Sequence, residues 1–231
     1  MGARGAGGSG GRFDDGLSVP ADVVRVSGTE PDPAVVTLAA ELLTAGSLLI
    51  YPTDTLYALG GRVLDAAAGA AVRRAKGREE GKPLPLVAAD LDQARSLCAA
   101  WPEAADRLAA RFWPGPVTLV IPAAPAVPAD VTAGSGTIAV RVPDLELTRA
   151  LCRHTGALVS TSANRAGGSP PITCADALEA VGAAAALALD AGRGRAGAST
   201  IVDLTSTPPR LLRAGAVSWE EIEGVLRSSA G

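Results

Sequence analysis

Residues 51–61 read YPTDTLYALGG, and residues 76–87 read KGREEGKPLPLV. The apolar run that precedes the first segment and the one that closes the second each predict a buried strand. Between them, Asp65 is a good N-cap for an alanine-rich helix, and Gly77 is a good residue to end it. Strand, helix and strand in succession are typical of an α/β layered domain.

The rest of the chain continues this alternation. We expect strands at 47–51, 84–88, 117–121, 137–142, 157–161, 185–189 and 200–204. We expect helices from the Asp32-Pro33 cap to Gly46, at 65–75, within 90–100, at 103–112, at 145–155, from Thr173 to Val181, and after a capping box of Ser218 and Glu221. The pattern therefore predicts a single α/β (α+β) domain with a mixed sheet over residues 18–231, preceded by a flexible glycine-rich tail at 1–17.

The composition limits the class of protein. The 231 residues are 48% hydrophobic and 19% charged, as in a globular chain. A net charge of −3 argues against a protein that coats nucleic acid non-specifically, and 3% aromatic residues argue against many base-stacking platforms. No apolar run reaches the roughly 18 residues of a membrane span, and the N-terminus lacks the apolar core of a secretory signal. We therefore expect a cytoplasmic protein with no membrane partner.

Cysteine and histidine are too sparse to build most metal sites. Cys98, Cys152 and Cys174 form no CxxC pair, so we expect buried thiols in a reducing compartment. His154 is the single histidine, which excludes zinc sites with several histidines. A Ser-His-Asp triad could use only this residue, placed at a predicted helix C-terminus.

The strand TIAVRV predicts a polar face. Because side chains alternate along a strand, Thr137, Ala139 and Arg141 share one face, and aliphatic residues take the other. A guanidinium holds carboxylates or phosphates through two parallel hydrogen bonds. The alternative is a solvated strand face with Arg141 at its edge.

The segment LVSTSAN follows the same logic. If it is extended, Ser160, Ser162 and Asn164 point one way before a Gly-Gly turn, which suits a ligand crevice at the end of a strand. The alternative is that the serines and the asparagine cap and form turns, which is their common task.

Hydroxyls and cations occur together in the opening segments. Thr53 and Thr55 fall on one side of an extended YPTDT, whereas Asp54 is expected to point away, to solvent or a cap. Lys76 and Arg78 can converge only if the helix breaks at Gly77 between them. The alternative is a solvated helix end whose cations complement the helix dipole.

A glycine-rich loop precedes a further pair of hydroxyls. Gly192, Gly194 and Gly197 would let backbone amides approach a phosphate ahead of Ser199, and Arg213 follows in LLRAG. No Walker loop is present, and ordinary surface-loop glycines are the alternative.

Taken in order, these segments resemble the YrdC-type threonylcarbamoyl-AMP synthases. The matching pieces are YPTDTLYALG, KGR…KPL, FWPGPVTLVI, TIAVRVPD, STSAN, STIVDL and LLRAG, which together span about 34–226. The resemblance implies a twisted mixed sheet flanked by helices, with a concave basic surface. It also implies ATP-dependent condensation of L-threonine with bicarbonate or carbon dioxide to threonylcarbamoyl-AMP and pyrophosphate, for modification of the tRNA adenosine beside the anticodon.

The resemblance also implies roles for particular residues. Threonine would be held by Thr53 or Thr55 together with Arg141 and Ser199. ATP would be held by Lys76, Arg78, Lys82, Thr137, Ser162, Asn164 and Arg213. Lys76 and Arg78 would act at the reacting phosphate, and Mg²⁺ would be carried by ATP, with no metal ligand from the protein.

Some features stay open. Ala58, Glu79, Val87 and Ala214 depart from the family pattern, which leaves the loop at 77–82 and the rim of the threonine pocket undecided. A non-catalytic binder of structured RNA and a carbamoyl-transfer module related to hydrogenase maturation are alternative functions. Oligomeric state, selectivity for threonine over serine, and a direct contact with tRNA or the downstream transferase complex are not decided by the sequence.

Overall fold

The computed structural model describes residues 21–77, 81–195 and 197–228. The predicted tail at 1–17, the start of the predicted domain at Ser18, and Arg78 lie outside these ranges.

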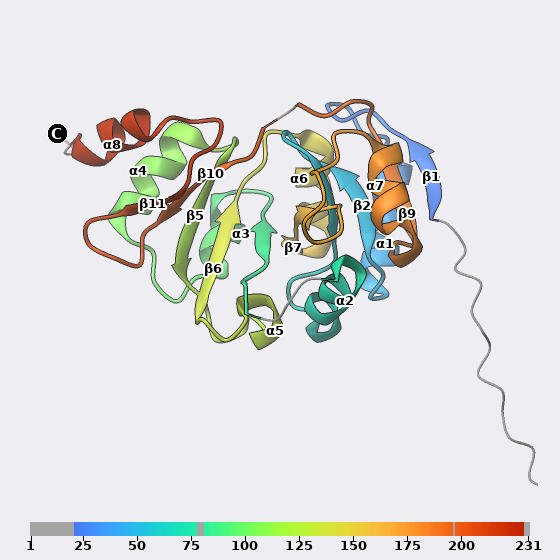
Figure 1. Ribbon diagram of the computed structural model, residues 1–231, viewed down its shortest axis with the longest axis horizontal. Coiled ribbons are helices and arrows are strands. Elements are labelled where there is room, and N and C mark those ends of the chain that lie inside the picture. The colour runs from blue at the N-terminus through green and yellow to red at the C-terminus, as the bar shows by residue number, and fades with distance from the viewer. Residues whose placement is uncertain (1–20, 78–80, 196, 229–231) are drawn as a thin grey trace, which may run out of the picture.

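The predicted α/β character with mixed strand directions is confirmed, but the strands form two sheets instead of one (Figure 1). The five-stranded sheet has the order β1 (Asp22–Arg25), β9 (Leu187–Asp190), β2 (Leu49–Pro52), β3 (Tyr57–Gly60) and β8 (Thr161–Ser162). The six-stranded sheet has the order β11 (Arg210–Arg213), β10 (Thr200–Asp203), β5 (Val117–Pro122), β6 (Thr137–Arg141), β4 (Pro85–Val87) and β7 (Leu158–Val159). Both sheets contain parallel and antiparallel pairs.

The chain passes from one sheet to the other at Ser160. The single strand predicted at 157–161 is therefore wrong: β7 pairs with β4 in one sheet, and β8 pairs with β3 in the other. At the junction Gly60 lies against the backbone of Val159, where a Cβ would stand 1.7 Å from the carbonyl oxygen, so only glycine fits. Tyr51 donates a 2.9 Å hydrogen bond to the same oxygen. These contacts hold the two sheets side by side.

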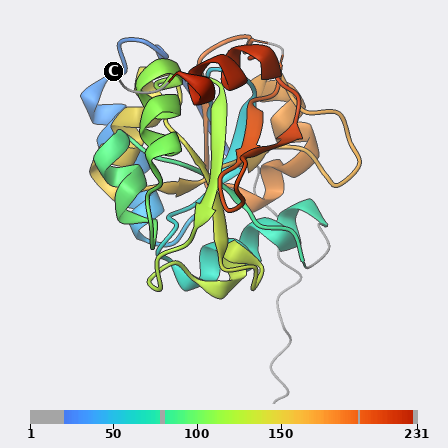
Figure 2. The same ribbon diagram turned by 90° about the vertical axis from the view of Figure 1, so that its left-hand side faces the viewer.

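Helices pack against both sheets. They are α1 (Pro33–Thr44), α2 (Ala66–Lys76), α3 (Leu91–Ser96), α4 (Glu103–Phe112), α5 (Ala129–Thr132), α6 (Glu146–Thr155), α7 (Cys174–Val181) and α8 (Trp219–Arg227), with a 3₁₀ turn at Gly182–Ala184. In Figure 1, α4 and α8 lie beside the six-stranded sheet, and α1 and α7 lie by the five-stranded sheet. Figure 2 looks at the molecule from the side of α4 and α8.

Local capping signals explain where several helices begin and end. Asp32 accepts a hydrogen bond from the Ala34 amide at 2.8 Å, Gly77 ends α2 in the left-handed conformation, and Ser218 with Glu221 forms the predicted capping box. Thr173 caps α7 through the Asp176 amide. Helix α5 and three short strands, β1, β3 and β11, were not predicted from the sequence.

The largest apolar cluster draws side chains from both sheets, including Ile50 and Leu59 from one and Leu86, Val140 and Val159 from the other. Each of these side chains is at most 1% exposed. Burial of an aliphatic side chain contributes about 1.5–3 kcal/mol, so this cluster is a main reason why the sheets stay together. The ends of the strands around this apolar cluster form the walls of a cavity.

Candidate functional site

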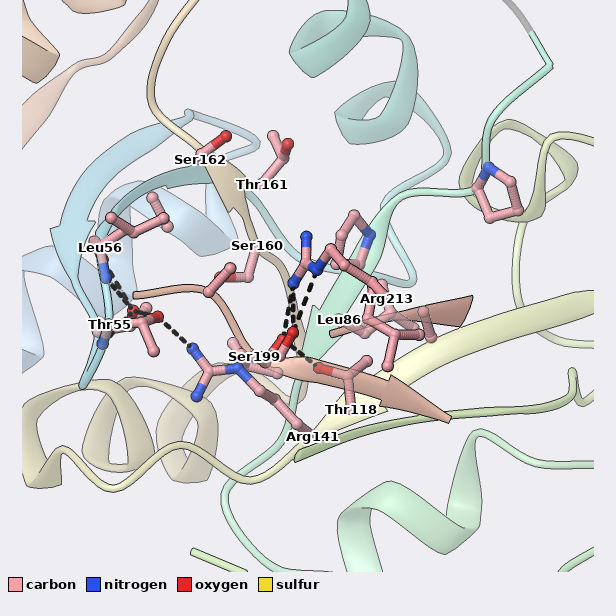
Figure 3. Close-up of a pocket in the computed structure, with 18 of the residues that line it drawn as sticks. Thr55, Leu56, Leu86, Thr118, Arg141, Ser160, Thr161, Ser162, Ser199 and Arg213 are labelled. Carbon is pink, nitrogen blue, oxygen red and sulfur yellow. Dashed lines mark hydrogen bonds between the residues drawn. The ribbon is translucent and has the colours of Figure 1, made fainter. Parts of the chain in front are cut away.

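A cavity of about 480 Å³ lies where the two sheets meet (Figure 3). Its wall comes from the loop after β2, from β4, β5 and β6, from the β7–β8 junction, from the loop before β10, and from β11. Eight of the residues singled out from the sequence line it: Thr53, Thr55, Lys82, Thr137, Arg141, Ser162, Ser199 and Arg213. The structure thus gathers residues that are up to 160 positions apart into one site.

Arg141 lies on the predicted polar face of β6. Its neighbours Ile138 and Val140 are fully buried in the core, as the alternation requires, whereas Arg141 lines the cavity and is 7% exposed. Nη1 donates to Asp54 Oδ1 at 2.5 Å, and Nη2 donates to Thr55 Oγ1 at 3.1 Å. Figure 3 shows the guanidinium directed at the Thr55 loop. The alternative of a solvated strand face is therefore wrong.

The prediction for Asp54 is also wrong. The carboxylate does not point to solvent or cap a helix; it forms a buried ion pair with Arg141, and both side chains are less than 10% exposed. Residues 53–56 leave the extended conformation and form the turn between β2 and β3, so alternation along a strand does not apply to them. The partner lies 87 positions along the chain, beyond the reach of local sequence rules.

The two threonine hydroxyls are hydrogen-bonded within the turn. Thr53 donates to the Leu56 carbonyl oxygen at 2.8 Å, and its Oγ1 accepts from the Thr55 and Leu56 amides, both at 3.2 Å. Thr53 Oγ1 and Thr55 Oγ1 lie 2.9 Å apart, and Thr55 Oγ1 accepts from Arg141. Thr53 is thus more fully engaged by its own turn, and Thr55 is better placed to meet a ligand.

Ser199 lies at the meeting point of another hydrogen-bond cluster. Thr118 Oγ1 lies 2.7 Å from Ser199 Oγ, and Arg213 Nη2 donates to both the hydroxyl and the carbonyl oxygen of Ser199, at 3.0 and 2.8 Å. Burial lowers the pKa of Arg213 from its ordinary value, and the nearby charge of Arg141 lowers it further. Two guanidinium groups therefore share one cavity, which favours an anionic ligand.

Two lining residues, Thr118 and Ser160, were not assigned to the site from the sequence. Both line the cavity, and Thr118 is a buried hydroxyl on the otherwise aliphatic strand VTLVIP. The sequence signal that could have identified Thr118 is a single polar side chain within an otherwise aliphatic strand. Ser160 was noted on its segment but was not carried into the site; it lies at the junction between the sheets.

Tyr57 fixes the loop that leads to Ser199. Its hydroxyl donates to the Gly192 carbonyl oxygen at 2.6 Å and accepts from the Ala191 amide at 3.1 Å. Burial raises the pKa of Tyr57, and the negative charge of Asp190 raises it further. The phenol therefore stays protonated and keeps donating. These hydrogen bonds attach the glycine-rich loop that contains Gly192 to β3.

Lys76 and Asn164 lie next to the cavity but are not part of the lining. Lys76 is 4% exposed, so the alternative of a solvated helix end is wrong for this residue. Its ammonium donates to the carbonyl oxygens of Ser162 and Asn164 and, at 3.3 Å, to the Asn164 side chain. The Asn164 amide donates to Arg165 and Gly168 within its own turn. Both residues fix the end of β8.

One part of the wall is apolar. Leu56, Leu86, Ile138 and Leu212 line the cavity together with its polar groups. Leu212 is 55% exposed on the edge strand β11. A flat apolar group such as a nucleobase can pack on such a surface while its charged part meets the arginines.

The described residues contain no group of three or more His, Cys, Asp or Glu side chains that could hold a metal ion. The described lining of the cavity carries cations and hydroxyls but no carboxylate. A divalent cation would therefore fit here only as part of an anionic ligand that brings it.

The thiols and the histidine take no part in the cavity. Burial raises the pKa of the Cys98, Cys152 and Cys174 thiols to about 11, 12 and 11, so they are protonated at neutral pH. His154 lies in the last turn of α6, as predicted, with Nδ1 2.8 Å from the Ala150 carbonyl oxygen. Within the described ranges, every helix is too short or too polar to cross a bilayer.

Comparison with protein families gives a match over residues 41–215 to the Sua5/YciO/YrdC model, described as telomere recombination. The chain is 39% identical over 191 residues to the threonylcarbamoyl-AMP synthase of Pyrococcus abyssi, which covers 82% of this chain and 56% of the relative. It is 38% identical over 173 residues to the threonylcarbamoyl-AMP synthase of Thiobacillus denitrificans, which covers 74% of this chain and 91% of the relative.

A solved structure has the same fold. P. abyssi Sua5 complexed with L-threonine superposes with a TM-score of 0.85 at 36% identity, over 89% of this chain and 61% of that one. The chain thus spans little more than half the length of the archaeal relative, and nearly the whole length of the shorter bacterial one.

Proposed function

Because the chain belongs to the Sua5/YciO/YrdC family, we propose that it is a threonylcarbamoyl-AMP synthase. The reaction joins L-threonine, bicarbonate or carbon dioxide, and ATP to give threonylcarbamoyl-AMP and pyrophosphate. The product then supplies the threonylcarbamoyl group for a tRNA adenosine beside the anticodon. One observation carries the proposal: Arg141 and Arg213 line one cavity, close enough for the charge of Arg141 to act on Arg213, and the described lining of this cavity has no carboxylate.

The amino acid is assigned to the Arg141 side of the cavity. The free N–H groups of Arg141 would hold the threonine carboxylate through two parallel hydrogen bonds. Thr55 and Ser199 also line this cavity and would offer their hydroxyls to the amino acid, with Thr53 hydrogen-bonded to Thr55. L-Threonine is also the ligand in the solved complex of the P. abyssi relative.

The nucleotide is assigned to the remaining wall. Arg213 and Lys82 would meet its phosphates, and Thr137 and Ser162 would offer hydroxyls beside the apolar surface that takes the base. Lys76 and Asn164 lie next to the cavity and are hydrogen-bonded to each other in the turn after β8. Arg78 follows α2 in the sequence. Lys76 and Arg78 would act at the reacting phosphate. The proposed nucleotide set is therefore Lys76, Arg78, Lys82, Thr137, Ser162, Asn164 and Arg213.

The chemistry needs positioning more than a protein nucleophile. The deprotonated amine of threonine adds carbon dioxide and releases a proton to solvent, which gives a carbamate. A carbamate oxygen then attacks the α-phosphorus of ATP, and the bond to the bridging oxygen breaks, so that pyrophosphate leaves with the electron pair. Both reactants are anions, and the cations of the cavity offset their repulsion while fixing them for in-line attack.

Magnesium would enter with ATP, bound to the phosphates, and would neutralise charge on the leaving pyrophosphate. The absence of a carboxylate from the described lining fits a metal that is carried by the nucleotide and not by the protein. The chain's own contribution is its arginine, lysine and hydroxyl groups.

The test is pyrophosphate release by the purified protein with ATP, Mg²⁺, L-threonine and bicarbonate, with the product identified by mass. We expect release to require both threonine and bicarbonate, and the product to be threonylcarbamoyl-AMP. Release that is independent of threonine would refute the proposal. Tight, salt-dependent RNA binding without turnover would favour the non-catalytic RNA binder instead.

Two arginines on the same strand provide a matched pair for this assay. Arg213 lines the cavity, whereas Arg210 pairs with Asp203 and its side chain is 65% exposed. We expect Arg213→Ala to lower the use of ATP about tenfold or more, since a charge-assisted hydrogen bond contributes about 1.5–3 kcal/mol. Arg210→Ala should leave turnover within about twofold of the wild type, as expected for a surface ion pair.

A further inference from the structure

Asp54 touches Arg141 from outside the cavity. Arg141 lines the main cavity, but Asp54 does not. Asp54 instead lines a second cavity of about 640 Å³, formed with the first turn of α6 and the loop at 191–195. The carboxylate therefore meets the guanidinium from outside the lining of the main cavity.

Two contacts fix the plane of the guanidinium. A guanidinium has one N–H on Nε and a pair on each terminal nitrogen. Asp54 takes one N–H of Nη1, and Thr55 takes one N–H of Nη2. The Thr55 hydroxyl is itself held by Thr53, whose hydrogen is committed to a backbone carbonyl oxygen. The remaining N–H groups of Arg141 have no partner among the described residues, so they are available to a ligand.

The charge of Asp54 matters as well as its position. Arg213 lies close enough for the charge of Arg141 to lower its pKa, so the two cations oppose each other in the cavity. Among the described residues, Asp54 is the carboxylate that pairs with Arg141. Both partners are almost fully buried, with 6% and 9% of their side chains exposed, so solvent screens their attraction little.

We propose that Asp54 is a positioning residue for Arg141: it holds the guanidinium from behind so that its free N–H groups face the threonine carboxylate. The inference rests on the proposed function, because it takes threonine as the ligand of Arg141. Asp54 itself does not touch the substrate. Loss of its charge should therefore weaken threonine use selectively and leave the use of ATP close to normal.

The test compares Asp54→Asn with Asp203→Asn in the pyrophosphate assay. Asp203 is a matched control, since its side chain is also 6% exposed and also pairs with an arginine, but its partner Arg210, unlike Arg141, does not line the cavity. For Asp54→Asn we expect the threonine KM to rise about tenfold or more, with the ATP KM within about twofold. For Asp203→Asn we expect neither KM to change more than about twofold. Asp54→Glu, which keeps the charge, should recover part of the threonine affinity.

The outcomes separate the two proposals. If the wild type releases no threonine-dependent pyrophosphate, the proposed function fails. If the wild type is active but Asp54→Asn changes both KM values equally, or neither, the role of Asp54 is refuted. If Asp54→Asn does not fold, Asp54→Ser replaces it, because a smaller polar side chain leaves room for water at Arg141. The same selective rise in the threonine KM is then expected, and its absence refutes the inference.

Discussion

Lys76 and Arg141 are almost equally buried, at 4% and 7% exposed, yet their charges are held in different ways. The ammonium of Lys76 donates to backbone carbonyl oxygens at the end of β8, and so it binds one part of the chain to another. Arg141 is braced by the carboxylate of Asp54 and keeps N–H groups for the cavity. The role of each buried cation therefore depends on the groups that it contacts and not on its burial alone.

Because Lys76 and Arg141 have different partners, we expect the removal of each side chain to have a different effect on stability. The carbonyl oxygens of Ser162 and Asn164 are neutral, so losing their bonds to Lys76 costs the desolvation of polar groups. A carboxylate that loses Arg141 becomes a buried, uncompensated charge, which costs more. The following variants separate the two regions.

The largest effect is expected for Arg141→Met. Asp54 would remain buried without its partner, and we expect the free energy of unfolding to fall by about 3–5 kcal/mol. Threonine-dependent turnover should fall by about 100-fold or more, since charge and two-pronged geometry are both lost. Urea unfolding and pyrophosphate release measure the two effects.

The double variant Asp54→Asn with Arg141→Met is the control for this interpretation. Removing both charges should restore most of the stability, because a buried ion pair is often replaceable by uncharged groups. It should not restore turnover. A double variant as unstable as Arg141→Met alone would show that the buried charge is not the cause.

A smaller loss is expected for Lys76→Met. Its acceptors in Ser162 and Asn164 are neutral, so we expect the loss of these bonds to cost about 1–3 kcal/mol and, for a chain of this size, to lower Tm by about 2–4 °C per kcal/mol. The ATP KM should rise while the threonine KM stays close to the wild-type value. Thermal unfolding and steady-state kinetics test both statements. A selective rise in the threonine KM would contradict the assignment of the two regions.

Thr55→Val tests the second hydrogen bond that positions Arg141, from its Nη2 to the Thr55 hydroxyl. Valine has nearly the same shape but no acceptor for Nη2, so we expect threonine use to fall about threefold to tenfold. Thr55→Ser keeps the hydroxyl and should stay close to the wild type. Steady-state kinetics with threonine varied at saturating ATP distinguish the variants. Equal activity of the valine and serine variants would show that the hydroxyl is dispensable.

The smallest effect on stability is expected for Ser162→Ala. Lys76 contacts the carbonyl oxygen of Ser162 and not its hydroxyl, so the variant keeps this bond. We expect the free energy of unfolding to stay within about 0.5 kcal/mol of the wild type. A larger loss would show that the hydroxyl, and not the backbone, holds this end of β8.

Short-range patterns predicted much of the fold. The polar face of TIAVRV follows from strand periodicity, and the ends of α1, α2 and α8 follow from capping residues that act within a few positions. For these features the determining contacts are local or follow from the alternation of strands and helices.

The remaining features depend on contacts far apart in the sequence. Asp54 meets Arg141 across 87 positions, and Lys76 meets the end of β8 across 86, so neither partner is visible from neighbouring residues. The division into two sheets depends on the change of partner at Ser160, within a segment that is uniformly suited to a strand. Gly60 in β3 lowers the strand signal there, although its lack of a side chain is what lets the sheets approach.

The most direct test of the account is to measure the KM values for L-threonine and for ATP in the wild type, Arg141→Lys and Lys76→Met. Arg141→Lys keeps a positive charge beside Asp54 but loses the planar fork. The account predicts a rise of about tenfold or more in the threonine KM alone for Arg141→Lys, and a rise in the ATP KM alone for Lys76→Met. If both variants affect the same substrate, or if Arg141→Lys leaves the threonine KM unchanged, the division of the cavity into an Arg141 side for threonine and a Lys76 side for the nucleotide is contradicted.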